Sequence, residues 1–221
     1  MTVSLQLYSM RDVADQIALL SKLPSMGITR VEGYGGVYGD PKVYRAAMDA
    51  NGITMPSGHM GLNDIEEDFD ATMDIVRTMG ITRVYAPYLE EKDRPTTTAG
   101  YVDLAKRLNA ASLRYAEHGI SFGWHNHDFE FMPLADGTII EDVLLEKCNP
   151  DWVNFQMDLY WVAKANANAL TYFEKYPGRF KAWHVKDMDK EGKFAPVGTG
   201  TIDFKSILAQ KEKSGMEFYL V

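Results

Sequence analysis

The hexapeptide MGITRV occurs twice in this chain, at residues 26–31 and again at 79–84. NGITM at 51–55 and HGISF at 118–122 are weaker copies of the same pattern. In each copy a glycine follows an amphipathic stretch and precedes a β-rich run, which is typical of a helix that ends at a glycine and is followed by a strand. The repeat therefore marks junctions between helices and strands.

The same alternation continues along the whole sequence. Eight strands alternating with helices predict a parallel sheet, and eight such units predict closure into an α/β fold, the (β/α)8 TIM barrel. An open doubly wound sheet ranks lower, because no G-x-G-x-x-G follows the first predicted strand. The predicted strands are 3–9, 28–34, 53–59, 81–88, 120–127, 153–160, 180–187 and 218–221. The predicted helices are about 12–25, 41–50, 65–78, 99–117, 139–148, 167–176 and 203–214.

The 221 residues show no compositional break, which predicts a single domain over 1–221. The last residue, Val221, falls inside the eighth predicted strand, so the barrel is expected to be truncated within strand 8. A complete barrel finishes this strand and adds an eighth helix.

Composition excludes several classes of protein. A net charge of −8 argues against nucleic-acid binding, which favours a basic face. One cysteine, Cys148, cannot form an intrachain disulfide, and a reducing cytoplasm is therefore the expected location. No apolar run approaches the roughly 18 residues that span a bilayer, so no membrane association is expected. The oligomeric state is left open, with a homo-oligomer as one option.

Chemically active side chains gather where the predicted strands end, which is where a barrel builds its active site. His125 and His127 are two residues apart on one strand and so share a face, as do His184 and Lys186. Asp158 lies near the end of the predicted strand 153–160, which falls between the strands that carry these two pairs. A mixed nitrogen and oxygen set suits Mn²⁺, Zn²⁺, Co²⁺ or Mg²⁺.

Loops after two strands are expected to wall this site. Asp136-Gly137 and Glu191-Gly192 are turn signals that predict hairpins after strands 5 and 7. The GTG at 198–200 is a weak candidate for a phosphate loop, and a flexible turn is the favoured interpretation.

Six segments spread over the chain carry a family resemblance: LQLYSMRD at 5–12, VEGYGG at 31–36, HNHDFEF at 125–131, MDLYWV at 157–162, WHVKD at 183–187 and VGTGTIDF at 197–204. Together they resemble the sugar phosphate isomerase/epimerase superfamily, the xylose-isomerase-like barrels. The resemblance implies one divalent metal ion held by side chains from strands 5 to 8, with Asp158 and His184 in the second and third places. The first place falls on His125, where relatives carry glutamate, and Glu130 or His127 are alternatives. The fourth ligand would follow Val221.

The resemblance also implies a small-molecule sugar substrate and an isomerase or epimerase that abstracts a proton next to a carbonyl. His127 or Glu130 would be the base, and Lys186 would hold an oxyanion or a hydroxyl. Glu32, His59, Tyr8 and Trp161 would contact the substrate. One alternative is a lyase or dehydratase acting on 3-keto-glycosides or inososes by enolisation and β-elimination, and another is a non-catalytic sugar-binding barrel. An endonuclease for abasic DNA is disfavoured by five histidines and the acidic charge.

Overall fold

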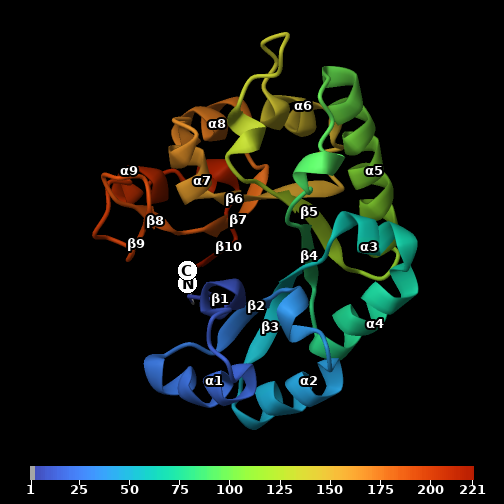
Figure 1. Cartoon of the computed structure of the whole chain (residues 1–221), viewed down its shortest axis with the longest axis vertical. Helices are drawn as coiled ribbons and strands as arrows, with labels where there is room; N and C mark the ends of the chain where they lie inside the picture. The colour runs from blue at the N-terminus through green and yellow to red at the C-terminus, as the bar shows by residue number, and fades with distance from the viewer. Residues whose placement is uncertain (1–2) are drawn as a thin grey trace.

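Eight parallel strands form the centre of the molecule in a computed structural model that describes residues 3–221. Their spatial order follows the chain, and helices pack around the outside (Figure 1). The strands are β1 (Leu5–Gln6), β2 (Arg30–Gly33), β3 (Thr54–His59), β4 (Arg83–Ala86), β5 (Ser121–His125), β6 (Val153–Asp158), β7 (Phe180–His184) and β10 (Phe218–Leu220). The α/β barrel predicted from the sequence is confirmed, and all eight predicted strands are present in shorter form.

The final strand joins the two edges of the sheet. β10 pairs with β7 in parallel, and Leu220 forms a parallel bridge with Ser4 on the other side. The backbone N–H of Gln6 donates to the carbonyl of Val221 at 2.9 Å, and the N–H of Val221 donates to Ser4 at 2.9 Å. β10 therefore closes the ring, and it lies beside the first described residues of the chain (Figure 1).

The helices follow the predicted alternation with three differences. The helix predicted at 65–78 is divided at Asp68, whose side chain accepts from Ala71 N–H and caps the second half. The helix predicted at 203–214 is also divided, and α7 was missed because its residues extend the apolar run of β6. The helices are α1 (Gln16–Lys22), α2 (Pro41–Ala50), α3 (Leu62–Glu67), α4 (Phe69–Met79), α5 (Thr98–Ala116), α6 (Ile140–Lys147), α7 (Leu159–Lys164), α8 (Ala169–Lys175), α9 (Phe204–Leu208) and α10 (Lys211–Ser214).

The repeated hexapeptide does mark junctions into strands. Gly27 and Gly80 adopt left-handed conformations with φ of 78° and 75°, which residues with a Cβ rarely adopt. Gly80 ends α4, and its N–H bonds to carbonyls of the last turn. Gly27 instead ends a short 3-10 helix, η2 (Pro24–Met26), that follows α1.

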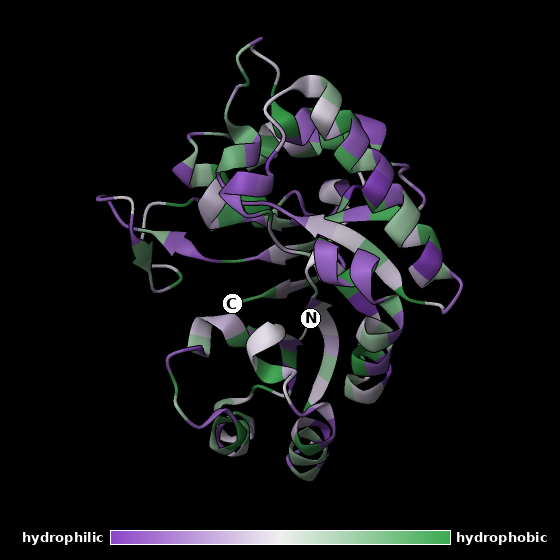
Figure 2. Ribbon diagram, turned by 45° about the vertical axis from the view of Figure 1, so that its right-hand side comes forward, coloured by the Kyte–Doolittle hydropathy of each residue, from purple (hydrophilic) through white to green (hydrophobic). Residues whose placement is uncertain are grey.

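The apolar core fills the layer between barrel and helices. Along the helices, hydrophilic and hydrophobic residues alternate (Figure 2), as expected for helices with one face against a sheet. Trp124, Trp183 and Phe155 are examples of large side chains buried in this layer. Within residues 3–221, no helix is both long and apolar enough to cross a membrane.

Two excursions leave the strand ends, as predicted. β8 (Asp187–Met188) and β9 (Phe194–Ala195) pair antiparallel and form the hairpin after β7. After β5 the chain forms a short 3-10 helix, η5 (Phe129–Phe131), and then an antiparallel bridge between Pro133 and Ile139.

Candidate functional site

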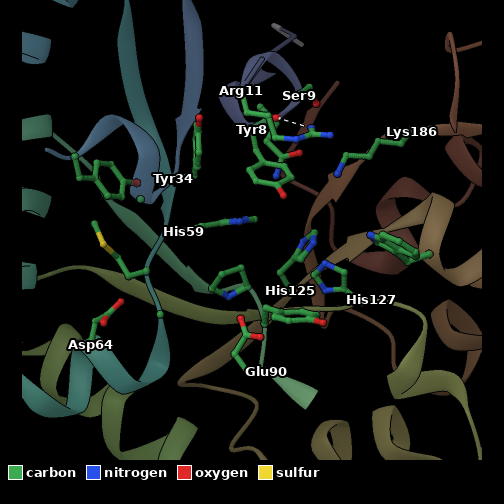
Figure 3. A pocket seen from close by; sticks show the side chains of 18 of the residues that line it. Tyr8, Ser9, Arg11, Tyr34, His59, Asp64, Glu90, His125, His127 and Lys186 are labelled. Carbon is green, nitrogen blue, oxygen red and sulfur yellow. Dashed lines mark hydrogen bonds between the residues drawn. The ribbon is translucent and has the colours of Figure 1, made fainter. Parts of the chain in front are cut away.

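A cavity of about 1390 Å³ opens at the carboxyl ends of the strands. Side chains from many separate elements point into it, including Tyr8, His59, His127 and Lys186 (Figure 3). The predicted substrate contacts Tyr8, His59 and Trp161 all line this cavity. The fold thus brings together residues that are far apart in the sequence. They lie at the end of the barrel where enzymes of this fold have their active sites.

Three buried histidines form the floor of the site. One ring nitrogen each from His59, His125 and His184 lies within 4.8 Å of the other two. Their rings contact one another, with centroids 4.6 Å apart for His125 and His184. Three imidazoles this close together place several ring nitrogens where one cation could meet them.

Asp158 lies beside this group and is fully buried at the end of β6. Its Oδ1 accepts the backbone N–H groups of Tyr160 and Trp161, so the carboxylate also caps α7. Its Oδ2 lies 3.5 Å from His184 Nδ1 and 2.9 Å from Lys186 Nζ. Burial alone would raise the pKa of Asp158, but Lys186 and His184 outweigh it and hold the pKa below its usual range.

Glu32 holds His184 from inside the barrel. Its Oε1 is 2.6 Å from His184 Nε2, and its Oε2 accepts the Gln156 amide at 2.7 Å. Burial alone would raise the pKa of Glu32, but His59 and His184 outweigh it and hold the pKa well below its usual value. The carboxylate is therefore ionised and can only accept hydrogen bonds. His184 Nε2 must therefore donate to Glu32, and Nδ1 is the ring nitrogen that faces Asp158.

Gln156 extends this network to the third histidine. Its amide nitrogen is bonded to Glu32, so its oxygen must accept from His59 Nε2, at 2.7 Å. Glu32 and Gln156 each follow a point where the register with the neighbouring strand shifts. Such irregularities re-aim side chains. Glu32, predicted as a substrate contact, is buried within the barrel and bonded to these groups instead.

His125 and His127 are uncharged at neutral pH. Burial lowers the pKa of His125 well below its usual value, and the neighbouring side chains, His184 first, lower it further. Burial also lowers the pKa of His127, to about 4, although Asp158 opposes the shift. His127 packs between Tyr88 and Trp161 and lines the cavity.

Glu130 lies apart from the cavity and is fully buried. Its carboxyl group accepts the Trp124 indole N–H at 3.1 Å and the His127 backbone N–H at 2.9 Å. Burial raises its pKa to about 8. These contacts hold the turn that carries His127, and they give no support to the prediction that Glu130 is a metal ligand or a base.

Asn126 joins the ends of β5 and β6. Its side-chain oxygen accepts the N–H of Asp158 at 3.0 Å, and its nitrogen donates to the Asp158 carbonyl at 3.4 Å. One side chain therefore continues the ladder of hydrogen bonds beyond the last paired residues, His125 and Gln156. The main chain of Asp158 is fixed on both sides.

Aromatic residues wall the outer part of the cavity. Tyr8 and Tyr34 pack edge to face with ring centroids 5.3 Å apart. On the opposite hairpin, Phe194 stacks on Tyr160 at 3.9 Å and meets the edge of Trp161. Aromatic side chains that line a cavity beside a few polar groups are typical of small-molecule sites.

Sequence analysis did not assign roles to Gln156, Asn126 and Phe194. Gln156 was detectable, because it lies two residues before Asp158 on the same strand and so shares its face. The role of Asn126 depends on bonds across strands, and no local pattern indicates it.

The model of the xylose isomerase-like TIM barrel family matches residues 20–220. The chain belongs to this family. The structure of a sugar phosphate isomerase/epimerase from Parabacteroides distasonis ATCC 8503 is 26% identical with a TM-score of 0.85, over 99% of this chain and 85% of that one. Inosose dehydratase of Lacticaseibacillus casei is 28% identical over 137 residues, 53% of this chain and 45% of that protein. The match thus spans less than half the length of that relative.

A solved structure that contains zinc shares the fold. The IOLI protein with a bound zinc atom has a TM-score of 0.74 and 14% identity, over 100% of this chain and 87% of that one. At this identity the likeness concerns the fold alone.

Proposed function

We propose that this chain is a divalent-metal-dependent enzyme that removes a proton next to the carbonyl of a keto sugar or related polyol, with isomerisation or epimerisation as the outcome. The observation that carries the proposal is the convergence of Asp158 Oδ2, His184 Nδ1 and His125 Nε2. The carboxylate oxygen lies 3.5 Å from the first nitrogen and 4.0 Å from the second.

These atoms fit a metal ion. Atoms that bind one ion at about 2.1 Å lie roughly 3 to 3.5 Å apart, so small movements would bring all three to ligand distance. Asp158 Oδ2 and His184 Nδ1 are buried and have no hydrogen-bond partner within residues 3–221; Lys186 meets the oxygen as an ion pair without hydrogen-bond alignment. Buried polar atoms are rarely left in this state unless another group satisfies them.

A bound ion would supply Lewis acidity, which lowers the free energy of an enediolate. The chain's own residues would do the rest. His127 lines the cavity as a neutral imidazole whose Nδ1 has no hydrogen-bond partner among the described residues, and it can accept the proton. Lys186 Nζ, at the same wall, can donate to a substrate oxygen that gains negative charge.

The second candidate is a dehydratase, in which the same enolisation is followed by loss of water. The similarity to inosose dehydratases favours it. Both reactions begin at the same carbon and need the same base, so the site geometry serves either outcome.

Exchange of substrate protons with solvent tests the proposal. Keto sugars and inososes are incubated in D₂O with protein loaded with Mn²⁺, Co²⁺, Zn²⁺ or Mg²⁺, and the carbon next to the carbonyl is followed by NMR. We expect metal-dependent deuterium incorporation that is lost in His184→Ala. Incorporation with release of water identifies the dehydratase. If no compound exchanges with any metal, the proposal is wrong.

A further inference from the structure

The loop after β9 closes around a carboxylate of the same chain. In this loop, Gly198 and Gly200 both donate their backbone N–H groups to Asp187 Oδ2, at 2.9 and 2.8 Å. Asp187 Oδ1 accepts the N–H groups of Met188 and Ile202, at 2.8 and 3.3 Å. Converging backbone N–H groups of this kind form an anion-binding concavity.

Asp187 fills this concavity as an ion. The residue is 1% exposed. Burial raises the pKa of its carboxyl group, but the N–H bonds, that of Gly200 first, lower it below the usual value. A Cβ added at Gly200 would overlap Asp187 Oδ1, so the carboxylate packs directly against the backbone of the loop. A phosphate group would have to displace a buried carboxylate to use these donors.

The other side of the loop faces the cavity and is apolar. Ala195, Pro196 and Val197 line the cavity, whereas the glycine N–H groups point to Asp187. The GTG segment at 198–200, considered above as a phosphate loop, is not part of the cavity lining, and the residues just before it present hydrocarbon to a ligand.

Charges on the remaining cavity wall also disfavour a dianion. Its acidic side chains outnumber its basic ones, and each basic group already contacts another side chain of the protein. Lys186 pairs with Asp158 at 2.9 Å. Arg94 stacks over Phe129 at 3.8 Å, and Arg11 lies over its neighbour Tyr8. The acidic lining residues are Asp64, Glu67, Asp68, Glu90 and Asp128; the basic ones are Arg11, Arg94 and Lys186.

We infer that the substrate is an uncharged keto sugar or polyol without a phosphate ester. Asp187 contributes to this selectivity because it occupies the backbone N–H groups of the loop that could otherwise bind a phosphate. The inference rests on the proposed function and specifies its substrate. Apolar faces of the sugar would pack on Tyr8, Trp161 and Phe194, and its hydroxyls would meet the polar floor.

Paired substrates test the inference. Ketoses and inososes are each compared with their phosphate monoesters in the D₂O exchange assay with metal-loaded protein. We expect kcat/KM to be at least about 100-fold higher for the free compounds, because bringing like charges together costs several kcal/mol. A preference for the esters overturns this inference and leaves the proposed function standing.

Binding of inorganic phosphate provides a test that needs no turnover. Isothermal titration uses EDTA-treated protein, because a bound metal would itself attract phosphate. Wild type and Asp189→Ser, a change at the nearby hairpin tip, are expected to bind no phosphate. Asp187→Ser vacates the loop and is expected to bind it. Wild-type protein that binds phosphate as tightly as D187S contradicts the inference.

Discussion

Glu32 Oε1 and His184 Nε2 lie 2.6 Å apart in the barrel interior, although 152 residues separate them in the sequence. A carboxylate that accepts from one nitrogen of a histidine fixes which nitrogen remains a lone pair. Here it directs Nδ1 toward Asp158. The proposed metal site therefore depends on a residue that does not line the cavity.

Replacing Glu32 tests this dependence. In Glu32→Gln, the amide can no longer accept from both His184 and Gln156, so the imidazole loses its fixed tautomer. We expect Co²⁺ affinity, measured by titration, to fall about 10- to 100-fold, with a changed visible spectrum. Glu90→Gln, at the exposed cavity edge, is the control and should bind normally. Unchanged Co²⁺ affinity and spectrum in E32Q would show that Glu32 does not orient His184.

Asn126 is expected to control the position of Asp158. Asn126→Asp removes the donor to the Asp158 carbonyl and adds a negative charge beside it. Loss of the bond with a buried acceptor left unsatisfied predicts destabilisation by about 1–3 kcal/mol, measured by denaturant unfolding. Asn63→Asp, an exposed position on α3, makes the same charge change. If both variants unfold alike, the role of Asn126 is refuted.

Replacing Glu130 distinguishes a structural role for this residue from a role as metal ligand. In Glu130→Gln, one oxygen can accept only one of the two N–H groups now bound. We expect stability to fall by about 1–3 kcal/mol, while metal affinity of the folded protein stays near wild type. Asp158→Asn, which alters a proposed ligand, is the comparison and should lose affinity. An equal loss of affinity in E130Q would restore Glu130 as a ligand.

Glu141 predicts a pH dependence of stability. It is fully buried on α6, and neither carboxyl oxygen has a hydrogen-bond partner in the described chain. Burial, with Glu130 adding to it, raises its pKa well above 4.5. Its contribution to stability is thus complete below the unfolded pKa and is lost as pH rises toward the folded pKa.

Unfolding free energies measured from pH 5 to 8 check this. In wild type, the free energy of unfolding should decline as pH rises through this range. Glu141→Gln should reduce the slope of that decline by up to about 1.4 kcal/mol per pH unit, the value for one proton. Glu146→Gln on the same helix, at an exposed position, should leave the slope unchanged. Equal slopes in wild type and E141Q would mean that Glu141 is not protonated in the folded state.

The sequence predicted the fold because its signals are local and repeated. The glycine after each amphipathic stretch placed the junctions, and the count of strands implied closure. It overextended β6 because Leu159 and Tyr160 continue an apolar run, although the Asp158 side chain caps a helix there. A capping bond of this kind competes with strand propensity and leaves no periodic pattern.

The site was predictable where it depends on strand ends. His125, Asp158, His184 and Lys186 were placed together by position, and the structure brings them together. Glu130 was assigned to the site because it follows His127 closely, but its side chain turns to the Trp124 indole. Glu32 likewise turns inward to His184, a partner from the far end of the chain. Side-chain direction across strands is set by packing, which the sequence does not display.

The most direct test of the central claim is the metal content of the chain and its dependence on Asp158 and His184. Protein purified with Mn²⁺, Co²⁺ or Zn²⁺ is analysed for metal per chain after dialysis. We predict one bound ion in wild type and loss of that ion in Asp158→Asn and His184→Ala, each shown by circular dichroism to be folded. Wild-type protein that binds no divalent ion, or variants that retain it fully, would contradict the account.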